Sequence, residues 1–113
     1  MNNVGPFTFH AAARVDHTTP AYLWQSGAFG AMTDNGAGDL THNLGADYGI
    51  DATEMLPFFA VDGALAASQL TSFGITSASD TAKRVTVLRE GAAGAASALT
   101  DVNYWMWIFR KVP

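Results

Sequence analysis

Residues 82–113 contain the feature that most restricts the fold, namely two runs in which apolar side chains recur at every second position. The first run, residues 83–89, places Val85 and Val87 on one side and three other side chains on the opposite side: Arg84, Thr86 and Leu88. A period of two is that of a β-strand, whose successive side chains point to opposite faces. The pattern therefore predicts two strands joined by a loop of small residues over 90–101.

The second run, residues 102–112, is apolar on both sides. One side carries Tyr104, Met106 and Ile108, and the other carries Trp105, Trp107 and Phe109. The first of these faces can fill the core of a sandwich. The second needs a cover of its own, because soluble monomers rarely leave three large aromatic side chains together in water. The face formed by Trp105, Trp107 and Phe109 is therefore the candidate interface.

Three interpretations of this aromatic face remain open. In the first, the strand is central and fully buried, with the sandwich core on one side and the N-terminal segment on the other. In the second, the face is a subunit interface, since aromatic residues are enriched at such contacts. In the third, it is a platform for sugars, whose apolar faces pack well on Trp and Tyr rings.

The rest of the chain also has the pattern of short strands separated by turns. Strands are predicted over residues 21–25, 28–33, 39–44, 54–61 and 70–76, and residues 64–69 can form one helical turn. No amphipathic helix longer than ten residues is apparent. These features predict an all-β fold, either a barrel or a sandwich, and we favour an antiparallel β-sandwich of about six to eight short strands.

Two local signals place strands more closely. Asn35 and Gly36 predict the turn of a hairpin, because both residues tolerate positive φ. Pro57 lacks a backbone N–H, so its strand is expected at a sheet edge or at a bulge.

The length of 113 residues suits one domain, 1–113, with a single core. No repeat and no linker divides the chain. Residues 17–20 predict a turn, and residues 1–20 are expected to be either a strand of the fold or an N-terminal arm that contacts a neighbouring molecule.

Composition restricts the partners. Only 14% of the residues are charged, whereas roughly a quarter is typical, so part of the surface is expected to be covered by other chains. The net charge of −4 and the six scattered basic residues argue against nucleic acid as a partner. No apolar run reaches the ~18 residues of a transmembrane helix, and no signal-peptide pattern follows Met1. We therefore expect synthesis in a cytoplasm and no membrane partner.

Residue types that carry chemistry occur without the spacing that catalysis or metal binding needs. The chain has no cysteine, and no two of its three histidines, His10, His17 and His42, suit a helix-borne metal pair. No nucleophile elbow surrounds Ser26.

Two groups of carboxylates were considered as sites. Residues 34–39 cluster carboxylates around glycines as calcium loops do, but they lack the spacing of an EF-hand, so a plain hairpin turn is expected. Asp47, Asp51 and Glu54 have no fixed geometry that suits glycoside hydrolysis. We therefore expect no metal, no cofactor and no enzymatic activity.

Three segments together resemble small β-sandwich modules of tailed-bacteriophage structural proteins. Residues 33–44 resemble their "D-x-G-x-G-x-Y-T-V-x-L" hairpin, and residues 55–63 stand in the place of their "Y-x-V-x-A-x-x-D/G" strand. Residues 83–94 with Asp101 and Val102 look like their closing "V-R-V-x-V-x-D-x-x-G-x-x-x-D-x-x-V-x-V" pair. The resemblance covers about residues 29–110, with Leu40 in place of the usual aromatic and a last strand richer in Trp and Phe.

This resemblance implies a structural role in a virion, usually as a homotrimer, with major capsid or tail proteins as partners. The short chain favours a capsid decoration or cement protein that self-associates on the particle surface over a long fibre with a shaft. The alternative is a receptor-binding or glycan-binding module of a tail fibre or tail tip.

Overall fold

The computed structural model describes residues 6–63, 70–89 and 96–112. The helical turn expected at residues 64–69 and the first part of the small-residue loop, residues 90–95, lie outside the described residues. Within the described residues no helix is long and apolar enough to cross a membrane.

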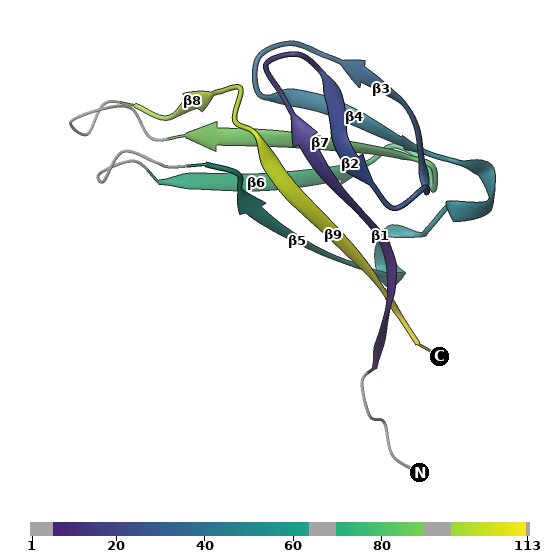
Figure 1. Cartoon of the computed structure of the whole chain (residues 1–113). Helices are drawn as coiled ribbons and strands as arrows, with labels where there is room; N and C mark the ends of the chain where they lie inside the picture. The colour runs from purple at the N-terminus through teal and green to yellow at the C-terminus, as the bar shows by residue number, and fades with distance from the viewer. Residues whose placement is uncertain (1–5, 64–69, 90–95, 113) are drawn as a thin grey trace.

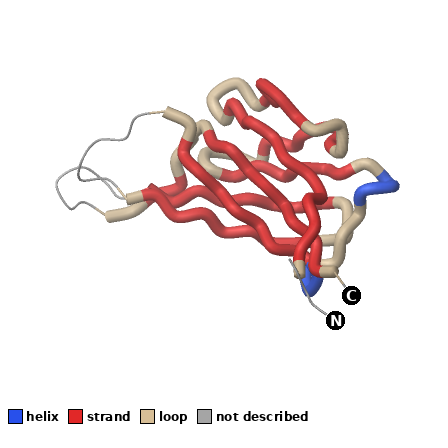
Figure 2. Tube along the Cα trace, turned by 60° about the horizontal axis from the view of Figure 1, so that its bottom comes forward, coloured by secondary structure: helices blue, strands red, loops and turns tan. Residues whose placement is uncertain are grey.

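Two antiparallel sheets pack face to face, as Figures 1 and 2 show. Sheet A contains, in spatial order, β2 (Ala21–Gln25), β1 (Phe7–Asp16), β9 (Tyr104–Lys111) and β5 (Met55–Val61). Sheet B contains β3 (Phe29–Asp34), β4 (Asp39–Leu44), β7 (Ala82–Arg89) and β6 (Thr71–Ser77), and the short β8 (Ala98–Leu99) pairs with β7. The connection from β4 to β5 holds two 3-10 turns, η1 (Ala46–Tyr48) and η2 (Ala52–Glu54). The predicted all-β sandwich is therefore confirmed, with about nine strands.

Alternating side chains of both sheets form one core. From sheet A they include Ala11, Ala13 and Val15 of β1 and Tyr104, Met106 and Ile108 of β9. From sheet B they include Phe29, Leu40, Leu44, Val85 and Val87. In sheet A, β1 therefore contributes small alanines to the core beside the large side chains that β9 contributes.

The N-terminal segment is a strand over residues 7–16. It pairs with β9 from Phe7 opposite Lys111 to Val15 opposite Tyr104. An arm is therefore the wrong description for these residues, because their alternation of small apolar side chains supplies one face to the core. Since β1 lies beside β9 in the same sheet, residues 7–16 do not cover the aromatic face of β9. The interpretation in which the N-terminal segment buries this face is therefore wrong for residues 7–16.

Two local predictions about strands are confirmed. Residues 29–44 form the β3–β4 hairpin, whose turn contains Gly36 and Gly38 at positive φ, +122° and +63°. Pro57 lies on β5, which is the end strand of sheet A among the described residues and pairs with β9.

Lys83 lies on the core side of β7, on the same face as Val85, and is fully buried. Its ammonium donates to the carbonyl of Ile50, to Ser77 Oγ at 2.8 Å and to Ser79 O at 3.2 Å. Burial lowers the pKa of Lys83. The side chain thus joins the β4–β5 connection to the turn between β6 and β7.

Candidate functional site

The outer side of sheet A, which faces away from the core, gathers six aromatic side chains from all four strands. We call this group the outer aromatic face; it consists of Phe9 on β1, Trp24 on β2, Phe58 on β5 and Trp105, Trp107 and Phe109 on β9. Strand pairing sets them in rows: Trp107 lies opposite Ala12 on one side and Phe58 on the other. Figure 1 shows the four strands as one continuous layer.

The rings contact one another across the strands. Trp105 and Trp107 stack with centroids 5.9 Å apart and planes 10° apart, and Trp24 approaches Trp105 at 6.3 Å. At the other end, Phe109 meets Phe9 and Phe58 edge-on, with centroids 6.2 Å and 5.7 Å apart. Such pairs stabilise one another beyond the area they bury. The rings therefore form two groups of three, which lie next to each other on the sheet because Trp107 is opposite Phe58.

Much of this surface is open to solvent. Phe9 is 55% exposed, Phe58 51% and Trp24 50%. The three aromatics of β9 are partly buried, whereas their neighbours on the strand, Tyr104, Met106 and Ile108, are fully buried. The two-sided character predicted for β9 is confirmed, and the interface role of Trp105, Trp107 and Phe109 stays a prediction.

Charged groups flank the rings at both ends of the face. Arg14 of β1 places its guanidinium 5.6 Å from the ring centroid of Trp105. The same side chain forms an ion pair with Asp62, with Nε 2.6 Å from Oδ2. Lys111, opposite Phe7, lies at the far end of β9. An apolar centre with a polar rim is the usual composition of a protein–protein interface.

The ring geometry suits packing against apolar protein surface. A sugar platform presents open ring faces, but Trp105 has one side stacked by Trp107 and the Arg14 guanidinium over its ring. Only Trp24, Phe9 and Phe58 offer large exposed areas.

A cluster of polar side chains lies inside the sandwich. His42 of β4 lies between two tyrosines, with Nδ1 2.7 Å from Tyr22 Oη and Nε2 2.6 Å from Tyr104 Oη. Burial, and to a smaller extent the charge of His17, lowers the pKa of His42 to about 3. Burial raises the pKa of both tyrosines. All three groups are therefore neutral at ordinary pH and hold the two sheets together.

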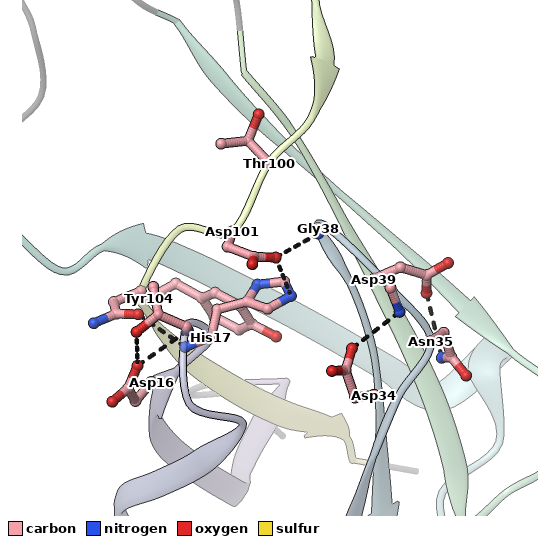
Figure 3. Close-up of polar contacts among 12 residues, drawn as sticks. Asp16, His17, Asp34, Asn35, Gly38, Asp39, Thr100, Asp101 and Tyr104 are labelled. Atoms are coloured by element: carbon pink, nitrogen blue, oxygen red, sulfur yellow. Dashed lines mark hydrogen bonds and ion pairs between the residues drawn. The ribbon is translucent and has the colours of Figure 1, made fainter.

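A second cluster joins three loops at one end of the sandwich, and Figure 3 shows Asp101 with contacts to both His17 and Gly38. Asp101 Oδ1 lies 3.4 Å from His17 Nε2 and accepts a hydrogen bond from Gly38 N at 2.8 Å. The backbone N–H of His17 donates to Asn103 Oδ1 at 2.8 Å. These contacts fix the positions of the loops.

Four of the five candidate carboxylates have a structural partner. Asp39 forms an ion pair with Arg84, whose hydrogen bonds lower the pKa of Asp39, and Asp34 accepts from Gly36 N at 2.9 Å. Asp51 caps η2 by accepting from Thr53 N. Glu54 pairs with Arg110 at 2.8 Å.

Clusters of three or more metal-ligating side chains are not found in residues 6–63, 70–89 and 96–112.

Sequence reasoning missed half of the outer aromatic face. Phe9, Trp24 and Phe58 stand in three separate strands, and no local pattern shows that they share a surface with β9. Alternation within residues 55–61 was the one available signal, because Phe58 and Phe59 point to opposite sides.

Comparison with known proteins adds no family to this description. No protein-family model, no curated protein and no solved structure matches the chain. The resemblance of residues 29–110 to phage modules therefore stays a prediction from the sequence.

Proposed function

We propose that this chain is a non-enzymatic virion structural protein, a capsid decoration or cement protein that self-associates through its outer aromatic face. The observation that supports this function is the outer aromatic face, on which two groups of three contacting rings share one side of sheet A and three of the six rings are about half exposed. Asp39 and Glu54 are held in ion pairs and His42 lies between two tyrosines, which is consistent with structural roles for these side chains.

Burial of the exposed rings supplies the free energy for association. Phe9, Trp24 and Phe58 are each about half exposed, so together they offer roughly 300 Å² of ring surface. At about 25 cal/mol per Å², this corresponds to about 7 kcal/mol from each copy. Losses of translational and rotational freedom offset about 4–15 kcal/mol of the total.

The virion part of the proposal rests on the resemblance, and the β-sandwich agrees with the fold of those phage modules. The resemblance also predicts a homotrimer with major capsid or tail proteins as partners. A low charged fraction of 14% is consistent with a surface that other chains cover.

A charge placed at the centre of the face tests self-association. Trp107→Asp is expected to give a monomer or no soluble protein, because an unpaired carboxylate would be buried in the contact. Light scattering on a sizing column measures the mass, and Leu88→Asp, on an exposed position of sheet B, is the control. A Trp107→Asp protein with wild-type mass and stability would contradict the interface.

A milder variant separates association from folding. Trp24→Ser combined with Phe58→Ser removes two exposed rings from the edge strands β2 and β5. The wild-type circular dichroism spectrum is expected to remain while the mass falls.

A glycan-binding or receptor-binding module of a tail fibre or tail tip is the second candidate. It is favoured by the exposed ring of Trp24 near the polar pair of Arg14 and Asp62. This function predicts that sugars quench tryptophan fluorescence. An unchanged signal across a glycan panel would count against it.

A further inference from the structure

We propose that two copies of this chain pack their outer aromatic faces against each other around a two-fold axis, with the strands of the two faces antiparallel. The inference rests on the proposed self-association and names its partner, a second copy, and its geometry. It replaces the homotrimer that the resemblance predicts with a two-fold dimer. Three observations support it: the uniqueness of the face, its area and the placement of its charges.

The face has no matching patch elsewhere in the part of the chain that the structure describes. A three-fold ring uses a heterologous contact, in which one patch meets a different patch on the next copy. Away from sheet A's outer side, the large exposed apolar side chains are Leu23, Tyr48, Leu70, Leu88, Leu99 and Val112. Among these only Leu88 and Leu99 are paired across strands. The best apolar partner for the face is therefore the same face of another copy.

The exposed area suits a dimer. Phe7, which is 40% exposed and lies beside Lys111, extends the surface of Phe9, Trp24 and Phe58. These four rings offer roughly 400 Å² together, about half of the ~800 Å² that each partner contributes to a standard interface. The partly buried rings of β9 and the flanking charged residues can supply the remainder.

The charges select the antiparallel orientation. Asp62 lies level with Asn103, since its N–H donates to Asn103 O at 2.9 Å, and Asn103 precedes Trp107 by four residues. Lys111 follows Trp107 by four residues. When the strands of the second copy run in the opposite direction and its Trp107 lies over Trp107 of the first, Lys111 of each copy is therefore level with Asp62 of the other. A parallel arrangement would instead place the two Lys111 ammonium groups together, where like charges repel.

The same symmetry identifies residues that face the identical residue of the other copy. An axis at Trp107 and perpendicular to the strands follows the row of Ala12, Trp107 and Phe58. In this orientation β5 lies over β5 of the partner, so Phe58 meets Phe58. With parallel strands the axis would follow β9, and Lys111 would meet Lys111.

Single cysteines test this geometry without interference, because the chain contains no cysteine. Phe58→Cys is expected to form a disulfide-linked dimer under mild oxidation. Lys111→Cys and the sheet B control Leu88→Cys are expected to link at least ten-fold less. Light scattering of the unmodified protein should give twice 11.9 kDa.

Each other outcome overturns a defined part of the inference. A trimer mass overturns the two-fold contact and leaves self-association standing. A monomer at every concentration overturns self-association itself. A dimer in which Lys111→Cys links, or in which Phe58→Cys does not, overturns the antiparallel orientation.

Discussion

His42 is a histidine that the fold keeps neutral. The hydroxyl of Tyr104 is fully buried, and His42 Nε2 is the acceptor that it reaches. With Tyr104 as the donor to Nε2, a neutral imidazole carries its proton on Nδ1 and donates to Tyr22 Oη, 2.7 Å away. Protonation of His42 would break this arrangement, because an imidazolium has no acceptor for the Tyr104 hydroxyl.

The lowered pKa of His42 predicts a loss of stability in acid. The pKa is 6.5 in the unfolded chain and about 3 in the folded one, so between these values only the unfolded chain binds the proton. Stability is therefore fully present above pH 6.5 and falls as the pH drops towards 3. At pH 5 the loss is about 2 kcal/mol.

Urea unfolding at pH 7 and pH 5 measures this loss. His42→Gln keeps a donor and an acceptor for the two tyrosines and does not titrate, so its stability should fall less over the same range. An identical pH dependence in the two proteins would show that His42 does not carry the effect.

Lys83 is a second buried group whose replacement has a predictable cost. Lys83→Met keeps an unbranched side chain that is one atom shorter, but it removes the donor to Ile50 O, Ser77 Oγ and Ser79 O. We expect the free energy of unfolding to fall by about 1–3 kcal/mol. Lys111→Met, at an exposed position, is the matched control and should change it by less than about 0.5 kcal/mol at high dilution.

The β3–β4 hairpin shows how one turn positions other elements. Gly38 adopts φ +63°, and its carbonyl accepts from Val87 N at 2.8 Å. A Cβ at this position would lie 2.5 Å from Thr100 N and 2.8 Å from Val87 O. The turn thus fits directly against β7 and the segment before β9.

Gly38→Ala is therefore expected to destabilise the protein by about 2 kcal/mol or more. The cause is the backbone contact, which no side-chain rotation can relieve. Gly30→Ala is the control, since its Cβ would meet only Asn43 O at 3.6 Å. Thermal unfolding compares the two, and a wild-type transition in Gly38→Ala would contradict the close fit.

At the scale of the whole molecule, the two sides of sheet A differ in how well their apolar side chains are buried. The inner side of sheet A is covered by sheet B, whereas its outer side presents the rings of the outer aromatic face. Folding alone therefore leaves apolar area that association can bury.

Coupling between association and folding makes the thermal transition depend on concentration. Because the second copy binds only the folded chain, the midpoint should rise as protein concentration increases. The Trp24→Ser, Phe58→Ser variant should show a midpoint that is independent of concentration. A wild-type midpoint equally independent of concentration would contradict self-association.

The sequence by itself determined the class of fold and most of its strands. Alternation in residues 83–89 and 104–109 predicts their two faces, because the period of a strand is a property of the local backbone. Asn35 and Gly36 predict the hairpin, and Pro57 predicts an edge strand, for equally local reasons: φ preference and a missing donor.

Only the tertiary structure decided which surfaces these strands make together. It joined Phe9, Trp24 and Phe58 to the β9 aromatics through cross-strand register. It also showed that residues 7–16 are a strand, and that Lys83 is buried among carbonyl and hydroxyl acceptors from distant segments. Register and acceptor positions depend on contacts between residues far apart in the chain, and alternation within one strand carries no information about the neighbour it will pair with.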